Sequence, residues 1–274
     1  MATHTSVYIF DIDGVITEPQ TKKFTNDKLI KLIIQLSSQN IIAFNTGRSS
    51  EWIQNQVLSK LPNLNQNNFF CSCEMGNVSL YYSPSGKVLE STHNNNLIPE
   101  QLSGTIIDLV ASSYYESMFV DKTKKVILTI EMKDGYPLAA YEKLRDRLSG
   151  EIRIILKHYH PNIHIRPSSS TIAIDVKSIE SNKKLGAHAI HNWIKTKIVG
   201  YQNLPYICLG DSSTDTDMSD YFYSVGFNTK FVFVGTESIN TDKKYPIIRT
   251  AKPFTKGTEE FLSTINDTIL GLQT

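Results

Sequence analysis

The first apolar segment of the chain is VYIFDIDG, residues 7–14, in which four strand-forming residues are followed at once by two aspartates. Successive side chains of a strand alternate between its faces, so Asp11 and Asp13 point to the same side while Ile12 points away. Gly14 then permits a sharp turn. Two carboxylates held this close repel each other unless a cation or a shared proton compensates them. The segment therefore predicts a buried strand that ends in a site, with a divalent metal as the third member of that site.

The composition is that of a folded globular chain. It has 274 residues, 40% of them hydrophobic, which is enough for one large domain or for a core with an insertion. The 28 Lys and Arg residues nearly balance the 27 Asp and Glu residues, so the net charge does not point to nucleic acid or an anionic membrane surface as a partner. Any selectivity for anions must then come from the residues of one site and not from the net charge of the chain.

The cysteines and the N-terminus indicate a cellular compartment. Cys71, Cys73 and Cys208 lack the partner spacing of a zinc site, and we interpret them as reduced core thiols. No basic region precedes an apolar segment at the N-terminus, so no signal peptide is predicted. No apolar run approaches the length that spans a membrane. The expected location is the cytoplasm.

Short, fully apolar segments alternate with amphipathic ones at both ends of the chain. Residues 6–10 and 41–44 are predicted strands with a helix at 25–38 between them, an order that implies parallel pairing. A further helix should begin at Ser49 or Ser50, which would be its N-cap. Strands are also predicted at 69–71, 206–209 and 231–234, with a closing helix at 259–270. Together these segments predict an α/β fold with one doubly wound parallel sheet.

The middle of the chain has a different pattern. Residues 80–82 and 87–89 flank the sequence SPSG, residues 83–86, as a predicted hairpin. A polar, asparagine-rich stretch at 91–96 follows it. We interpret that stretch as a linker.

Beyond the linker, strands and helices alternate without the parallel-sheet pattern. We expect an α+β domain inserted at 92–178, which leaves 1–91 and 179–274 as the core. Its predicted elements are helices near 98–117 and 137–148 and extended segments at 125–132, 152–157, 162–166 and 171–176.

Four short motifs place charged or hydroxyl residues where a predicted strand ends or a helix begins. They are Asp11-x-Asp13, Thr46-Gly47-Arg48, Lys183, and the segment from Gly210 to Asp215. In an open parallel sheet the carboxyl ends of the strands share one edge, so residues after the strands at 6–10, 41–44 and 206–209 can converge. Convergence there predicts an active site.

The residue types at these positions match the needs of phosphoryl transfer, which are a nucleophile, a cation, a proton donor and positive charge. Asp11 would attack phosphorus and become an aspartyl phosphate. Asp13 would protonate the leaving alcohol and then take a proton from water. The expected cation is Mg²⁺, because the candidate ligands are hard oxygens: Asp11, the backbone carbonyl of Asp13, Asp211 and Asp215.

Hydroxyl and basic residues complete this predicted site. Thr46, with the backbone amides of Gly47 and Arg48, would form an anion cradle at the start of a helix, although Thr46 could equally be a plain helix cap. Arg48 would reach the substrate phosphate or the inserted domain, or else tie its loop by a salt bridge. Lys183 would neutralise charge on the phosphate and on the attacking carboxylate. Lys184 competes for that role, and the apolar spacing of the following helix favours Lys183.

In all four motifs and in their order, the chain resembles the haloacid dehalogenase (HAD) superfamily of phosphatases. The hydrophobic strand and DxDG of that family are similar to residues 10–14, its Thr/Ser-Gly-Arg to residues 46–48, and its fourth motif to residues 210–215. The resemblance spans most of the core, and it implies a Rossmann-like core, Mg²⁺ as cofactor and an aspartyl-phosphate intermediate.

The inserted domain resembles the large α+β cap of one branch of this superfamily. That branch holds Cof-type sugar phosphatases, sucrose-phosphate phosphatase, trehalose-phosphate phosphatase and phosphomannomutase, and residues 74–76 are similar to its Glu-Asn-Gly turn. The fourth motif is most similar to the trehalose-phosphate phosphatase form, in which Thr precedes the second aspartate. Two positions depart from the pattern: Ser212 replaces an aspartate, and Lys184 stands where a glycine is usual.

The predicted function is that of a magnesium-dependent phosphomonoesterase acting on a phosphorylated sugar or a related small metabolite, with the cap closing to exclude water. Its partner would be that small molecule, with neither nucleic acid nor membrane. Two alternatives stay open. A phosphomutase or phosphotransferase similar to phosphomannomutase would pass the phosphoryl group to a sugar hydroxyl, and a non-catalytic binding protein would use the cap surface to recognise another protein.

Overall fold

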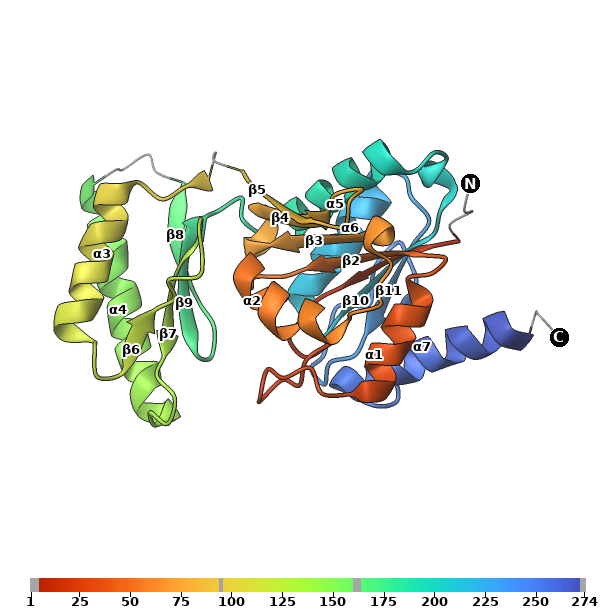
Figure 1. The fold of residues 1–274 in the computed structure, drawn as a ribbon. Coiled ribbons are helices and arrows are strands. Elements are labelled where there is room, and N and C mark those ends of the chain that lie inside the picture. Colours follow the sequence, from red (N-terminus) through yellow and green to blue (C-terminus); the bar gives the residue numbers. More distant parts are fainter. Residues whose placement is uncertain (1–4, 94–95, 160–163, 272–274) are drawn as a thin grey trace. The chain divides into compact units, whose positions relative to one another are not determined.

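The computed structural model describes residues 5–93, 96–159 and 164–271, which belong to two compact units (Figure 1). The core unit comprises Met1–Ser91 with Lys183–Thr274, and the inserted unit comprises Thr92–Asn182. The chain thus leaves the core once and returns to it at the start of a helix.

The core unit is built on an eight-stranded sheet with the order β12-β11-β10-β1-β2-β3-β4-β5. The strands from β12 to β3 pair in parallel, and β4 is antiparallel to β3. The strands are β1 Val7–Phe10, β2 Ile41–Asn45, β3 Phe69–Cys73, β4 Val78–Tyr82, β5 Val88–Thr92, β10 Tyr206–Gly210, β11 Thr229–Phe233 and β12 Ile247–Arg249.

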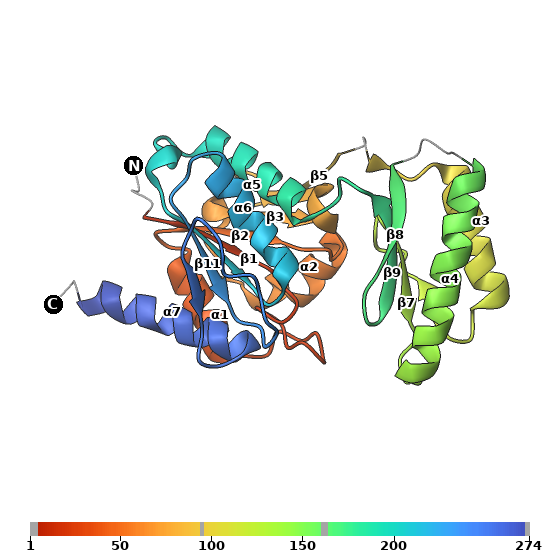
Figure 2. The same ribbon diagram turned by 180° about the vertical axis from the view of Figure 1, so that it is seen from behind.

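Helices cover both faces of this sheet (Figures 1 and 2). On one face lie α5 (Lys183–Lys197) and α6 (Thr216–Ser224), and on the other lie α1 (Asp27–Leu36) and α7 (Phe254–Gly271). A short helix, α2 (Ser50–Gln56), follows β2. Because both faces are covered, the central strands β1, β2 and β10 are buried along their whole length. The doubly wound parallel sheet predicted from the sequence is confirmed.

The strand registers bring the functional ends of three strands to one edge. Phe10 is aligned with Leu209 of β10 on one side and with Phe44 of β2 on the other. The amide of Asp11 continues the ladder by donating to the carbonyl of Leu209, at 3.0 Å. Residues that directly follow these strands therefore emerge side by side, which is the convergence expected of a parallel sheet.

Over its described residues, 92–93, 96–159 and 164–182, the inserted unit is a four-stranded antiparallel sheet with two α-helices and its own apolar core. The strand order is β6-β7-β9-β8. Part of the strand predicted at 162–166 lies outside the described residues. The elements are α3 Glu100–Ser113, β6 Met118–Val120, β7 Leu128–Met132, α4 Leu138–Tyr159, β8 Ile165–Ser169 and β9 Ala173–Ser178.

The strand predicted at 152–157 is wrong, because α4 continues through it from Leu138 to Tyr159. The run of isoleucines there has the composition of a strand. However, the buried apolar residues of this part of the helix are Leu148, Ile152 and Leu156, which recur every four residues and join the core of the inserted unit. Packing of that helical stripe outweighs the local propensity.

Among the described residues, no helix combines the length and the apolar character that crossing a bilayer requires.

Candidate active site

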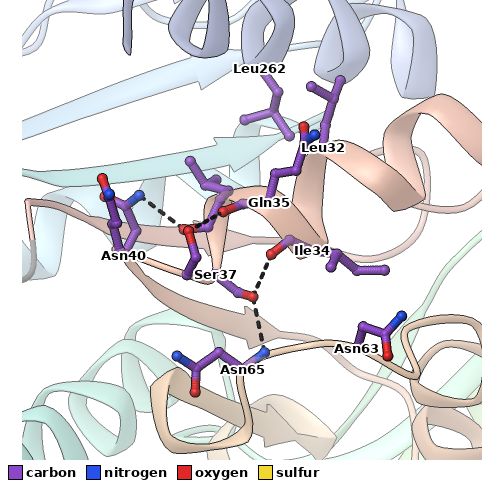
Figure 3. Close-up of a pocket in the computed structure, with 11 residues that line it drawn as sticks. Leu32, Ile34, Gln35, Ser37, Asn40, Asn63, Asn65 and Leu262 are labelled. Atoms are coloured by element: carbon purple, nitrogen blue, oxygen red, sulfur yellow. Dashed lines mark hydrogen bonds between the residues drawn. The ribbon is translucent and has the colours of Figure 1, made fainter. Parts of the chain in front are cut away.

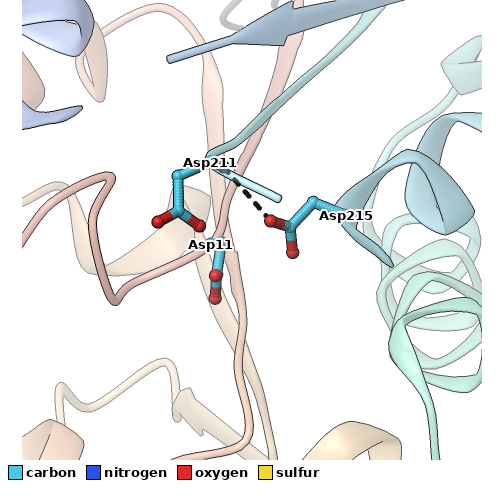
Figure 4. A group of neighbouring side chains, drawn as sticks. All are labelled: Asp11, Asp211 and Asp215. Atoms are coloured by element: carbon cyan, nitrogen blue, oxygen red, sulfur yellow. Dashed lines mark hydrogen bonds between the residues drawn. The ribbon is translucent and has the colours of Figure 1, made fainter. Parts of the chain in front are cut away.

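Three aspartates from distant parts of the chain meet at the carboxyl edge of the core sheet (Figure 4). Asp11 follows β1, Asp211 follows β10, and Asp215 lies at the start of α6. One carboxylate oxygen of each lies within 4.8 Å of the others. Such a spacing of hard oxygen donors allows a single ion to contact all three.

The turn between β10 and α6 holds Asp215 in place. Its Oδ2 accepts hydrogen bonds from the amides of Asp211 (3.2 Å) and Ser212 (3.0 Å), and from the Ser212 hydroxyl (2.8 Å). The side chain is buried. Ser212, which departs from the family pattern, thus serves here as a cap of the turn.

The turn after Asp13 depends on a glycine that touches the acidic cluster. Gly14 has a φ of +77°, and a Cβ built on it would overlap the carboxylate of Asp211. The backbone of this turn therefore forms one wall against which the Asp211 carboxylate lies.

Lys183 is the basic residue that the structure brings to the cluster. Its Nζ lies 2.5 Å from Asp11 Oδ1 and 3.1 Å from Asp215 Oδ1, and it also donates to the backbone carbonyl of Asn45, at 2.7 Å. Lys183 is buried, whereas Lys184 is exposed. Of the two lysines weighed from the sequence, only Lys183 contacts the acidic residues named here.

The cluster carries more negative than positive charge. Three buried or half-buried carboxylates face one ammonium. Burial raises the pKa of Asp11 to about 8, although Lys183 acts in the opposite direction. Burial, with Asp215 nearby, raises the pKa of Asp211 to about 7. Burial also disfavours the charge of Lys183, but Asp11 and Asp215 together hold its pKa above the usual range.

A hard divalent cation fits this site. With all groups ionised the three carboxylates and the ammonium leave two uncompensated negative charges, and every candidate ligand is an oxygen. The backbone carbonyl of Asp13, which the sequence suggests as a further ligand of the ion, stays a prediction. The residues that would hold the ion are Asp11, Asp211 and Asp215.

Asp13 takes a different partner. Arg48 donates from Nε to Asp13 Oδ2 and from Nη2 to Oδ1, each at 2.9 Å, and its guanidinium also lies over the ring of Trp52. Lys22 Nζ lies 3.6 Å from the same carboxylate. Burial opposes the charge of Asp13, but the hydrogen bonds and charge of Arg48, with Lys22, hold its pKa below the usual range. Of the roles considered for Arg48, the structure shows the salt bridge.

The loop that contains Thr46 and Gly47 is braced by the segment Glu74–Gly76. The amide of Met75 donates to the Thr46 carbonyl (2.9 Å), and the amide of Glu74 donates to the Arg48 carbonyl (3.0 Å). The Thr46 hydroxyl accepts from the Arg48 amide at 3.1 Å. Thr46 is therefore not the cap of α2.

The N-cap of α2 is Ser49, whose hydroxyl accepts from the amide of Trp52 at 3.1 Å. This was one of the two serines predicted. Gly47 lies between Thr46 and Arg48, and a Cβ at Gly47 would meet Met75 Cε at 2.9 Å. Thr46 and Gly47 thus lie in a tightly supported loop, and their role as an anion cradle stays a prediction.

Sequence reasoning missed Lys22 and Asn45, two of the charged or polar residues that contact the predicted ones. Lys22 lies near Asp13, and Asn45 contacts Lys183. For Asn45 a signal was present, since it is a polar residue that directly continues the apolar strand at 41–44 and becomes the last residue of β2. Lys22 stands in a polar loop with no periodic pattern, and nothing in the sequence distinguishes it.

One hollow of the core unit lies away from this site. It has a volume of about 550 Å³ and lies between the end of α1 and α7, where Figure 3 shows Gln35, Asn63 and Leu262. Asn40, which also lines it, precedes β2, so the hollow lies at the amino edge of the sheet. It is lined by none of the predicted site residues.

No family model and no curated protein matches this sequence. Solved structures do resemble it. A trehalose-6-phosphate phosphatase of Aspergillus fumigatus is 16% identical, with a TM-score of 0.54 over 97% of this chain and 93% of its own. A haloacid dehalogenase-like hydrolase of Bacteroides thetaiotaomicron is 13% identical, with a TM-score of 0.64 over 95% and 99%. An IMP-nucleotidase of Plasmodium falciparum is 13% identical, with a TM-score of 0.58 over 96% and 68%.

Proposed function

We propose that this chain, which has the fold of the haloacid dehalogenase-like hydrolases, is a magnesium-dependent phosphomonoesterase that acts through an aspartyl phosphate. The observation that carries the proposal is the meeting of Asp11, Asp211 and Asp215 within 4.8 Å of one another, beside the buried ammonium of Lys183. A phosphate ester brings negative charge and needs compensation where it reacts. The ion and Lys183 would supply that compensation.

Asp11 is the proposed nucleophile. One of its carboxylate oxygens would attack phosphorus as the bond from phosphorus to the leaving alcohol oxygen breaks, giving an aspartyl phosphate and the free alcohol. Water would then attack phosphorus, break the bond to Asp11 and release inorganic phosphate. Lys183 contacts Asp11 Oδ1, so it would fix the orientation of this carboxylate through both displacements.

Asp13 is the proposed acid and base. It would give its proton to the leaving alcohol oxygen and later accept one from the attacking water. The Arg48 pair holds Asp13 ionised, which suits the second task. For the first task the pair must loosen, so Arg48 would control when Asp13 carries its proton. Mg²⁺, when bound by Asp11, Asp211 and Asp215, would offset the charge that gathers on the phosphoryl oxygens.

The substrate we propose is a sugar phosphate or a related small phosphorylated metabolite. Support comes from the trehalose-phosphate phosphatase form of residues 210–217 and from full-length similarity to a trehalose-6-phosphate phosphatase. The similarity to an IMP-nucleotidase makes nucleoside monophosphates the second group to assay.

The test measures inorganic phosphate released from an aryl phosphate and from a panel of sugar phosphates and nucleoside monophosphates, with Mg²⁺ and with EDTA. We expect release only with Mg²⁺, and none from the Asp11→Asn variant at an unchanged circular dichroism spectrum. Equal turnover by this variant would refute the proposed nucleophile. A wild-type chain that is silent across the whole panel would refute the phosphatase itself. An isomerised sugar phosphate in place of inorganic phosphate would identify a mutase.

A further inference from the structure

Asn45 holds Lys183 from two directions. Lys183 Nζ donates to the backbone carbonyl of Asn45 at 2.7 Å, and the Asn45 side-chain amide donates back to the carbonyl of Lys183 at 2.8 Å. Asn45 is fully buried at the end of β2, and Lys183 is the first residue of α5. The two residues are 138 positions apart, so this contact joins a strand to a helix through one residue on each.

The backbone carbonyl of Asn45 completes the surroundings of the ammonium. A lysine ammonium has three N–H donors. Here three acceptors face it: Asp11 Oδ1 at 2.5 Å, Asp215 Oδ1 at 3.1 Å and the Asn45 carbonyl at 2.7 Å. Contacts with oxygens on three sides therefore fix the place of the ammonium.

The start of a helix is an unfavourable place for this charge. The helix macrodipole is positive at its N-terminus and repels a cation in the first turn. Lys183 lies there and points into the site, so the backbone that carries it needs an anchor. The Asn45 side chain supplies one, because it binds the carbonyl of Lys183 itself.

Gly186 makes room for that anchor. A Cβ built at Gly186 would overlap the Asn45 carboxamide, with Nδ2 at 2.8 Å and Cγ at 2.6 Å. Gly186 lies one helical turn after Lys183, on the same face of α5. The carboxamide therefore fills the space that any other residue at 186 would occupy, and Asn45 and Gly186 form a matched pair.

We propose that Asn45 is a positioning residue that sets the place of the Lys183 ammonium against Asp11, and that Gly186 is required for it to do so. The expected effect on kinetics rests on the proposed function, in which Lys183 orients Asp11 and compensates the charge of the phosphoryl group. Asn45 acts through its two hydrogen bonds with Lys183, and in the proposed mechanism it touches neither the reacting carboxylate nor the substrate.

Asn40, which directly precedes β2, provides a matched control. It is 2% exposed, and its side-chain amide donates to the carbonyl of Leu36 at 3.0 Å. Asn40→Ala therefore removes a buried hydrogen bond of the same kind, together with one that Asn40 accepts from the Thr5 hydroxyl at 2.6 Å, without touching the site. Both alanine variants should lower Tm, and only Asn45→Ala should also lower kcat.

The kinetic test measures kcat and KM for an aryl phosphate with Mg²⁺. We expect Asn45→Ala to lower kcat at least about tenfold with KM within about twofold, because a displaced ammonium costs most in the transition state. Gly186→Ala should also lower kcat. The double variant Asn45→Ala/Gly186→Ala should be no slower than Asn45→Ala alone, since the overlap is then gone.

A wild-type kcat in Asn45→Ala, or effects of the two substitutions that simply multiply, would overturn the inference. The same is true if Asn40→Ala slows turnover as much. These outcomes all require an active wild type, so they differ from a failure of the proposed function, in which the wild type itself is silent.

A second measurement does not depend on activity. In protein labelled with ¹⁵N-lysine, a buried ammonium in contact with three oxygens exchanges its protons slowly and gives an observable NMR signal. We expect one such signal in the wild type, absent from Lys183→Met and broadened in Asn45→Ala but not in Asn40→Ala. An unbroadened signal in Asn45→Ala would show that the side chain does not position the ammonium.

Discussion

The contact between Gly14 and Asp211 makes a substitution at Gly14 a sensitive probe of the site. A Cβ at this position would lie 2.7 Å from Asp211 Cγ, about 0.7 Å inside the 3.4 Å at which ordinary contact begins. In Gly14→Ala the carboxylate or the turn must therefore move by most of an ångström. A shift of that size in a catalytic group can cost about 10²-fold in rate.

The stability cost of Gly14→Ala has two parts. The φ of +77° is left-handed, which costs a residue with a Cβ about 1–2 kcal/mol. Forcing the Asp211 side chain from its rotamer adds about 0.5–1.5 kcal/mol. We therefore expect the free energy of unfolding to fall by about 1.5–3.5 kcal/mol, with kcat reduced about 100-fold.

The variant Gly200→Ala measures the backbone cost without the clash. Gly200 lies in the same unit with a φ of +76°, and nothing lies within 4 Å of a Cβ built on it. Gly200→Ala should therefore cost only the backbone term, about 1–2 kcal/mol, and leave kcat unchanged. Urea unfolding and steady-state phosphate release would be measured on both variants. Equal losses of stability together with full activity in Gly14→Ala would refute the close approach that we describe.

Three further outcomes are expected. Arg48→Ala should lower kcat about tenfold, and Arg48→Lys should restore little of that loss, because only a guanidinium can bind both oxygens of Asp13. Steady-state kinetics on an aryl phosphate would check this expectation. Full activity in the alanine variant would contradict it. Mg²⁺ at about 100 times its Kd should stabilise the wild type by about 2.7 kcal/mol, and the Asp211→Asn variant much less. The measurement is Tm with Mg²⁺ and with EDTA. Equal shifts of Tm in the two proteins would exclude Asp211 as a ligand. Burial and neighbouring positive groups lower the pKa of His191 below 6.5, so the unfolded chain takes up this proton first and stability should fall as the pH drops through 6.5. Urea unfolding at pH 7 and pH 5 should show a smaller fall for His191→Gln, and an identical fall would contradict the assignment.

The sequence determined the sheet, because its strands are recognisable one at a time. Segments such as 7–10, 41–44 and 206–209 are wholly apolar, and only a strand covered on both faces buries such a segment completely. Their order with intervening helices implies parallel pairing, and parallel pairing places the residues that follow them at one edge. The nearness of Asp11 to Asp211 follows from this local information alone. The prediction of a strand at 152–157 was wrong because the conformation of this segment depends on packing against residues outside it, in the core of the inserted unit.

Only the tertiary structure decided which groups pair within the site. Lys183 rather than Lys184 contacts Asp11, Arg48 is bound to Asp13, and Asn45 is joined to α5 through the space left by Gly186. Each of these contacts joins residues more than 30 positions apart, and each depends on distances of a few ångströms between elements. Local propensity and periodicity specify which elements form and which face is buried. The direction of a side chain at a strand end, and the partner that neutralises its charge, are set by packing between elements, which no single segment of the sequence contains.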